Sequence, residues 1–259
     1  MNIVVMGRRH QGKSTLARFL GERIQSRVGA HTILAFDPKR TFRILPHTSD
    51  LAELEEMITD PRYNFVAYQP LGLEREPSEQ DMAGEFDAFF RALGIEYHLG
   101  MGDESPRHNL SPVVLIVDEA WMLQQRGQIN GSLAQLVRLA DSENFYLIQA
   151  AHRPSDFNTA TRAQIDEFFS FRQWLADDLD ILQEWAGAEV AEKIAKLPPH
   201  HVIRFDIGSE TWELWAKPEA WYLKNKEGDS SERNNGDTES VPDATGDDRN
   251  QQAETLARA

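Results

Sequence analysis

Residues 7–14 read Gly-Arg-Arg-His-Gln-Gly-Lys-Ser, a GxxxxGKS pattern that directly follows the apolar run at 2–6. A loop of this kind binds polyphosphate because its glycines let consecutive backbone N–H groups point inward. The helix that follows adds the positive end of its dipole. Good helix formers come next, with Leu16, Phe19 and Leu20 on one face. Strand, loop and helix therefore stand in the order that a nucleotide-binding P-loop requires.

The P-loop pattern assigns a role to each of its last polar residues. Lys13 is expected to bridge the β- and γ-phosphates of a nucleotide, and Ser14 to offer its hydroxyl to Mg²⁺. The residues expected to bind the nucleotide are Gly7, Arg8, Arg9, His10, Gln11, Gly12, Lys13, Ser14 and Thr15. ATP and Mg²⁺ are therefore the expected cofactors.

Composition restricts the class of protein. The chain has 259 residues, a formal charge of −15 at pH 7 and no cysteine. This length suits one α/β domain with a tail, and the lack of cysteine excludes disulfides and thiolate metal sites. The negative charge argues against broad electrostatic coating by nucleic acid, so contacts with DNA are expected to be local. The longest apolar runs fall far short of the ~20 residues that cross a bilayer, and no signal peptide precedes the P-loop. We expect a cytoplasmic protein without an intrinsic membrane segment.

Apolar runs alternate with amphipathic stretches along the first two thirds of the chain. Strands are expected at 32–36, 64–69, 113–117 and 145–151, helices at 49–58, 78–93 and 128–140, and a loop at 94–111. The helix at 78–93 carries a stripe that we interpret as core, formed by Met82, Phe86, Phe89, Phe90 and Leu93. The strands at 113–117 and 145–151 are unbroken apolar runs, as in a parallel sheet buried on both faces. The predicted fold class is α/β, a doubly wound and mainly parallel sheet.

The pattern weakens beyond Pro154. A strand near 167–173, helices near 177–186 and 188–196, and a C-terminal hairpin of 202–207 with 211–216 are expected. Five tryptophans gather in this half, and we interpret them as core or subunit interface: Trp174, Trp185, Trp212, Trp215 and Trp221. From residue 224 onward the chain is too polar to offset ordering entropy by burial. The predicted organisation is a P-loop domain at 1–223 and a disordered acidic and polar tail at 224–259.

Two carboxylates complete the expected site, because the strand at 113–117 ends in Asp118 and Glu119. Asp118 is expected to hold Mg²⁺ through its water shell, and Glu119 to orient and deprotonate the water that attacks the γ-phosphate. In P-loop ATPases with an additional strand, the tip of the next strand carries a polar sensor. Here His152 is the first candidate and Gln149 the alternative. A histidine that only caps the loop explains His152 as well.

Four segments make the chain resemble the FtsK–HerA superfamily of DNA-pumping ATPases. They are GRRHQGKS at 7–14, AFDPKRTF at 35–42, VVLIVDEAW at 113–121 and AAHRPSDF at 150–157, and the resemblance covers about residues 1–207. It implies a RecA-like P-loop ATPase domain. The catalytic residues implied are Lys13, Glu119, His152, Gln149 and Arg153.

Two departures from the superfamily pattern concern the neighbouring subunit and the sensor. Asp141 stands near the place where many relatives carry an arginine that reaches into the next subunit's site. The candidates for that arginine are Arg138, Arg153, Arg162 and Arg172. His152 stands where relatives carry glutamine. Its imidazole can make the same hydrogen bond but adds pH dependence near about 6 to 7.

The resemblance is strongest to the compact genome-packaging ATPases of icosahedral, membrane-containing viruses, because no accessory domain is evident. It implies a homo-oligomeric ring, a hexamer, that drives double-stranded DNA through its pore, with a capsid or membrane partner protein, in host cytoplasm or virion. Basic residues that could contact DNA are Arg8, Arg9, Lys39, Arg40 and Arg43, although a solvated charged rim explains them equally well. Two alternatives stay open. One is a motor for conjugation, plasmid transfer or filamentous-phage assembly, and the other is an ATP-binding switch or scaffold with little turnover.

Overall fold

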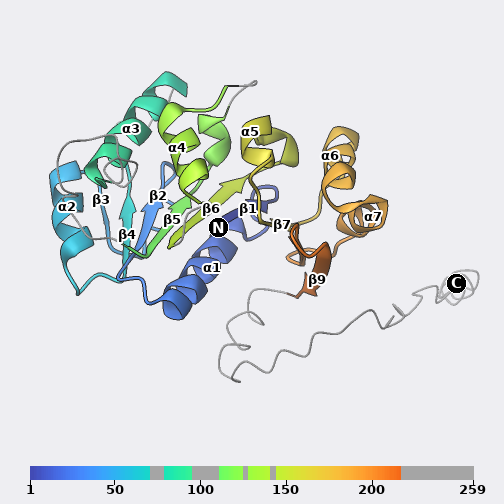
Figure 1. Ribbon diagram of the computed structural model, residues 1–259, viewed down its shortest axis with the longest axis horizontal. Coiled ribbons are helices and arrows are strands. Elements are labelled where there is room, and N and C mark those ends of the chain that lie inside the picture. Colours follow the sequence, from blue (N-terminus) through green and yellow to red (C-terminus); the bar gives the residue numbers. More distant parts are fainter. Residues whose placement is uncertain (71–78, 95–110, 125–127, 141–143, 217–259) are drawn as a thin grey trace, which may run out of the picture. The chain divides into compact units, whose positions relative to one another are not determined.

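The structure is a computed structural model that describes residues 1–70, 79–94, 111–124, 128–140 and 144–216 (Figure 1). The predicted tail at 224–259, Trp221 and nearly all of the predicted loop at 94–111 lie outside these ranges. Within them, no helix is both long enough and apolar enough to cross a bilayer.

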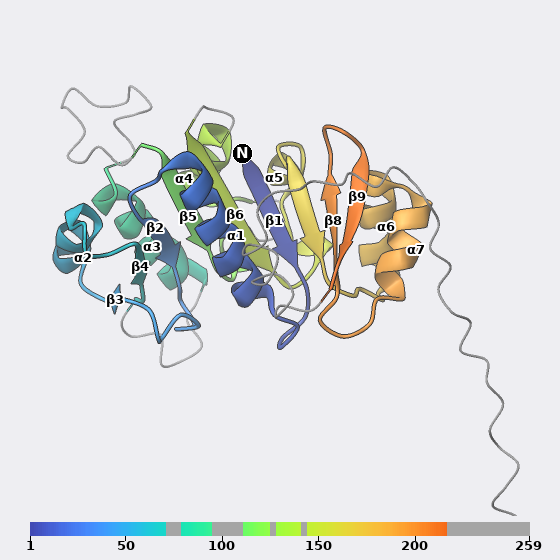
Figure 2. The same ribbon diagram turned by 90° about the horizontal axis from the view of Figure 1, so that it is seen from below.

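A nine-stranded sheet organises the described part of the chain, in the order β3-β4-β2-β5-β6-β1-β7-β8-β9 (Figures 1 and 2). The strands are β1 Asn2–Met6, β2 Ile33–Phe36, β3 His47–Thr48, β4 Phe65–Tyr68, β5 Val113–Val117, β6 Phe145–Ala151, β7 Glu167–Ser170, β8 Val202–Asp206 and β9 Thr211–Trp215. Pairing is parallel from β3 through β7 and antiparallel for β7–β8 and β8–β9. The predicted mainly parallel α/β sheet with a C-terminal hairpin is confirmed.

The strand order decides where the site lies. β6 pairs with both β1 and β5, so one additional strand separates the P-loop strand from the strand that ends in Asp118. β7 pairs with the other side of β1. Because parallel strands end at the same edge of a sheet, the loops after β1, β2, β5, β6 and β7 gather at one place, which we call the carboxyl edge.

Helices cover both faces of the sheet. They are α1 Lys13–Val28, α2 Leu51–Thr59, α3 Glu79–Ala92, α4 Gly131–Leu139, α5 Thr159–Arg162, α6 Ala176–Ala186 and α7 Ala188–Ala195. α1 packs on the face of β1 that carries Ile3 and Val5. α6 and α7 pack on the opposite face with Val4 and Met6. Figure 1 shows α3 and α4 across the sheet from α1. Period-two alternation along β1 thus separates two apolar layers.

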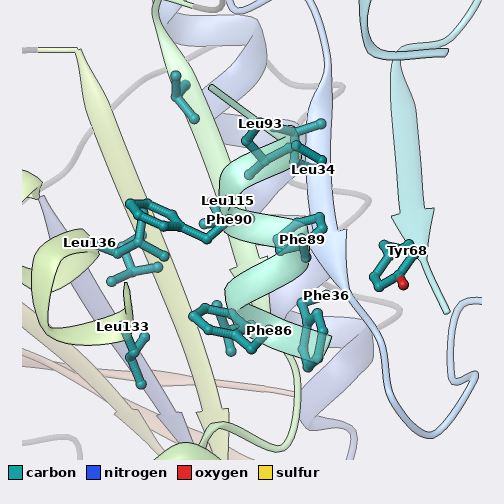
Figure 3. Close-up of a cluster of buried hydrophobic side chains, with 14 of the residues drawn as sticks. Leu34, Phe36, Tyr68, Phe86, Phe89, Phe90, Leu93, Leu115, Leu133 and Leu136 are labelled. Atoms are coloured by element: carbon teal, nitrogen blue, oxygen red, sulfur yellow. The ribbon is translucent and has the colours of Figure 1, made fainter. Parts of the chain in front are cut away.

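The aromatic stripe of α3 forms the centre of one layer, as predicted. Phe86, Phe89 and Phe90 are fully buried, and Met82 and Leu93 are buried with them. Phe86 meets Phe36 of β2 edge to face, with ring centroids 5.0 Å apart, and Phe89 stacks on Tyr68 of β4 at 5.6 Å (Figure 3). Such pairs add to the free energy gained by burying the rings. α3 therefore fixes β2 and β4, and with them the loop that follows β2.

Several element boundaries differ from the predicted ones for local reasons. Asp50 caps α2, where its side chain accepts hydrogen bonds from the backbone of Ala52 and Glu53. α4 begins at Gly131 rather than 128, because Asn130 is its cap and accepts from the backbone N–H of Leu133. Residue 78, at which the helix of α3 was predicted to begin, lies outside the described residues. The short edge strand β3 was not predicted, since two residues carry no alternation to detect.

Candidate active site

The P-loop connects β1 to α1, and both of its glycines have a structural reason. Gly12 caps α1 with φ of 105°, a left-handed conformation that favours glycine. A Cβ on Gly7 would lie 2.8 Å from Gln11 and from Phe171, so only glycine fits there. The backbone N–H of Gly7 donates to the carbonyl of Ala151 at the end of β6, 3.3 Å away. The loop is thereby fixed to the neighbouring strand tip.

Lys13 is the first residue of α1, and its side chain turns back toward the loop. The residue is 8% exposed, and its Nζ donates to the carbonyl oxygen of Arg8 at 3.3 Å. Burial lowers the pKa of Lys13, while the negative charges of Glu119 and Asp118 act in the opposite direction. A buried ammonium facing two carboxylates is the charge arrangement expected at a polyphosphate site.

Ser14 and Asp118 face one another across the carboxyl edge. The Ser14 Oγ lies 3.4 and 3.3 Å from the two carboxylate oxygens of Asp118. Burial, together with the charges of Glu119 and Asp37, raises the pKa of Asp118 to about 6. Within the described ranges no group of three or more histidines and acids could hold a metal alone. One hydroxyl and one carboxylate suit Mg²⁺, which takes few protein oxygens and completes its shell with phosphates and waters. These two residues therefore fit the predicted magnesium site.

Glu119 is held by three donors. Its Oε1 lies 3.1 Å from the Nζ of Lys39, and its Oε2 lies 2.8 Å from the Nε2 of His152 and accepts from the indole N–H of Trp121. Burial acts to raise the pKa of Glu119, but the hydrogen bonds from His152 and Trp121 and the positive charges nearby lower it to about 2. The backbone of Glu119 has φ of 53°, an uncommon value for a non-glycine residue that is typical of functional sites.

His152 stands at the tip of β6, as predicted for a sensor. Its ring meets the Trp121 ring edge to face, with centroids 6.0 Å apart. Its backbone N–H donates to Asp156 Oδ2 at 3.0 Å, and its carbonyl accepts from Gln173 Nε2 at 3.3 Å. The imidazole is therefore fixed between β5 and β6 and bonded to Glu119, where it can respond to the group that Glu119 orients.

Gln149, the alternative sensor, belongs to a different environment. It is fully buried, its Oε1 accepts from Gln124 Nε2 at 2.8 Å, and its Nε2 donates to Asn2 Oδ1 at 2.9 Å. Gln124 in turn accepts from the hydroxyl of Thr161 at 2.8 Å. This buried polar chain joins β1 and β6 to α5. It uses both ends of the Gln149 amide, so the geometry favours His152 as the sensor.

The arginine candidates divide by their partners. Arg153 donates through Nε to Asp178 of α6 at 2.9 Å, and Asp178 is fully buried. Arg162 donates to the carbonyl of Phe157 at 2.7 Å. Arg138 and Arg172 lie exposed. An arginine that reaches a neighbouring subunit has to extend from the surface, so Arg138 and Arg172 suit that role better than the two bonded ones.

Asp37 was part of a predicted motif, but its function as a loop anchor was not recognised. It is fully buried and accepts from the backbone N–H groups of Thr41 and Phe42 at 2.7 and 2.9 Å and from Gln69 Nε2 at 2.9 Å. Burial raises its pKa. These bonds fold the segment after β2 so that Lys39 reaches Glu119. No local pattern marks that pair, because its members are far apart in sequence.

The sequence matches no family model and no curated protein. Solved structures are similar, however. The genome packaging NTPase B204 from Sulfolobus turreted icosahedral virus 2, in complex with AMPPCP, has a TM-score of 0.63 and 18% identity, over 83% of this chain and 96% of that chain. Its complex with ATP-gammaS gives 0.62 and 16% over the same shares. The chain has the fold of B204.

A second similar structure is VirB4 of Thermoanaerobacter pseudethanolicus, with a TM-score of 0.55 and 13% identity over 84% of this chain and 90% of that chain. The present chain matches nearly the whole length of the chain in each of these two structures. The predicted fold of a P-loop ATPase with an additional strand is therefore confirmed by comparison as well as by strand order.

Proposed function

We propose that this chain is a Mg²⁺-dependent ATPase that assembles into a ring and translocates double-stranded DNA, most closely in the manner of a genome-packaging motor. The observation that carries the proposal is the meeting of Lys13, Ser14, Asp118, Glu119 and His152 at one edge of the sheet. These residues come from the start of α1 and from the ends of β5 and β6, which no local segment of the chain could bring together.

Nucleotide binding is explained by the P-loop and its lysine. Backbone N–H groups of the loop and the N-terminus of α1 favour phosphate oxygens, and Lys13 places a buried positive charge beside them. Ser14 and Asp118 would hold Mg²⁺, and this ion would neutralise negative charge on the β- and γ-phosphates. The raised pKa of Asp118, about 6, is consistent with a carboxylate whose burial a cation compensates.

Hydrolysis depends on Glu119. With a pKa of about 2, this carboxylate is ionised at neutral pH but is a weak base. It can accept a hydrogen bond from water and orient that water toward the γ-phosphate. To take the proton as well, Glu119 has to lose part of the stabilisation that Lys39, His152 and Trp121 provide, because each of them favours the unprotonated form. His152 and Lys39 are thus placed to control when Glu119 acts.

DNA contact is assigned to the loop after β2. Lys39, Arg43 and Ile44 are exposed on it, and Arg40 is half-buried. Three basic residues on one short loop give a local positive site in a chain whose formal charge is −15. Because Lys39 is also bonded to Glu119, phosphate contact at this loop offers a direct route from DNA to the hydrolytic residue. The likeness to B204, a genome packaging NTPase by name, supports packaging as the task.

An ATPase assay with and without duplex DNA tests the proposal, run beside a size measurement in a non-hydrolysable ATP analogue with Mg²⁺. A DNA-stimulated rate and a ring-sized oligomer are expected. An ATPase rate that DNA does not change, in a protein that stays monomeric, would contradict the proposed translocase function. ATP binding without measurable turnover would instead favour the switch or scaffold.

The genes beside this one separate packaging from transfer. Capsid genes support a packaging motor. Relaxase or secretion genes support a motor for conjugation or plasmid transfer, built on the same ATP site.

A further inference from the structure

Trp174 is an exposed aromatic residue directly beside the P-loop. The Cζ of Arg8 lies 3.6 Å from the centroid of the Trp174 ring, so the guanidinium stacks on one face of the indole. The residue nevertheless stays 46% exposed, one of few large apolar side chains that do so among the described residues. A ligand that covers this exposed indole surface removes apolar area from water, which favours binding beside the phosphate-binding loop.

In the strand order, Trp174 and Glu119 follow strands that lie on opposite sides of β1. Asp118, Glu119 and His152 follow β5 and β6 on one side of β1, whereas Trp174 follows β7 on the other side. A nucleoside triphosphate is linear, with the γ-phosphate at one end and the base at the other. When the γ-phosphate faces Glu119 and the phosphate chain lies along the P-loop, the base emerges on the β7 side.

The segment that carries Trp174 is fixed to the P-loop and to the sensor strand. Gln11 Nε2 donates to the carbonyl of Arg172 at 3.5 Å, and Phe171 packs so closely on Gly7 that a Cβ there would be 2.8 Å away. Gln173 is 3% exposed and donates to the carbonyl of His152 at 3.3 Å. The indole is therefore held in place before any ligand arrives, which reduces the entropy lost on binding.

We infer that Trp174, held by Arg8, is the platform on which the base of the bound nucleotide stacks. This inference rests on the proposed function, since it names how the same site recognises its substrate. Indole and guanidinium planes both stack well on heterocyclic bases, and Arg8 covers one face of the ring, so the base takes the surface left exposed. The ligand class is a nucleoside triphosphate, and the contribution of Trp174 is to the base alone.

Calorimetric titration of the full chain in Mg²⁺ with two probes, ATP and inorganic tripolyphosphate, isolates that contribution. Trp174→Ala is expected to weaken ATP binding about tenfold, equal to about 1.4 kcal/mol, and to leave tripolyphosphate binding unchanged. Trp174→Phe, which keeps a stacking ring, is expected to stay within about threefold of wild type for ATP. Trp212→Ala is the matched control, because Trp212 is also exposed, at 38%, but lies on the edge strand β9.

Each other result contradicts the inference. Equal ATP affinity for wild type and Trp174→Ala would overturn it while leaving the proposed ATPase intact. Equal losses for ATP and tripolyphosphate would also overturn it, because Trp174 would then support the loop rather than the base. A wild-type protein that binds neither probe would overturn the proposed function as well.

Discussion

Glu119 and His152 meet between two neighbouring strand tips, with the carboxylate Oε2 2.8 Å from the imidazole Nε2. The pair joins the end of β5 to the end of β6, and Lys39 adds a positive group at 3.1 Å from the other carboxylate oxygen. The orientation of Glu119 therefore depends on His152, the proposed sensor of the γ-phosphate, and on Lys39, which lies on the loop proposed to contact DNA.

His152 is predicted to act through Glu119. His152→Ala should lower kcat for ATP by roughly 10- to 100-fold with little change in KM, since removing an orienting contact raises the barrier by about 1.4 to 2.7 kcal/mol. His152→Gln, which restores a hydrogen-bonding group, should recover part of that loss. Steady-state phosphate release measures both. The control is His31→Ala, since His31 is exposed before β2, and a wild-type kcat for His152→Ala would exclude the sensor role.

Arg43 is predicted to contact DNA phosphate. Arg43→Ala should weaken duplex binding and reduce the slope of log K against log salt by about 0.9, the value for one lost phosphate contact. Fluorescence anisotropy over a salt series gives this slope. Arg27→Ala removes the same charge from the last turn of α1, where Arg27 is exposed away from the carboxyl edge. Equal slopes for the two variants would show that the charge acts only through the overall field.

Asp37 is predicted to make stability depend on pH. Burial raises its pKa above the ordinary value of about 3.9, so the folded protein holds this proton more tightly than the unfolded chain does. The free energy of unfolding should therefore fall as pH rises through the raised pKa. Urea unfolding of wild type and Asp37→Asn from about pH 4 to about pH 7 tests this, and wild type should lose stability relative to the variant. Parallel curves would show that the carboxyl group does not titrate abnormally.

Gln149 is predicted to stabilise the fold rather than to sense phosphate. Gln149→Ala removes the hydrogen-bond partner of Gln124 Nε2 and of Asn2 Oδ1, both buried, and should cost about 2 to 4 kcal/mol of unfolding free energy. The affinity for ATP should stay near that of wild type. Denaturant unfolding and nucleotide titration separate the effects, with exposed Gln128→Ala as control. If Gln149→Ala unfolded at the wild-type denaturant concentration but no longer hydrolysed ATP, Gln149 would be the sensor instead.

The sequence predicts those features of the fold and of the site that lie within one continuous segment of the chain. Each of three features lies within one continuous segment: the GRRHQGKS loop, the apolar strands and the aromatic stripe of α3. The spacing of apolar residues within such a segment indicates whether it is a strand or a helix. Asp118 and Glu119 could be placed opposite Ser14 because parallel strands end at one edge. The pairs Lys39–Glu119 and Arg8–Trp174, and the chain through Asn2 and Gln149, could not be predicted. They join residues whose distance in space is set by strand order, which no single segment carries.

The assignment of Glu119 as the hydrolytic residue is tested by measuring phosphate release from ATP by wild type and by Glu119→Gln, with nucleotide binding measured on both. Glutamine keeps the size of the side chain but loses the carboxylate, so turnover should fall by roughly 10² to 10⁴ while ATP binding is kept. Glu189→Gln, on the exposed surface of α7, should hydrolyse ATP as wild type does. Undiminished turnover by Glu119→Gln would contradict the assignment of this edge of the sheet as an ATP-hydrolysing site.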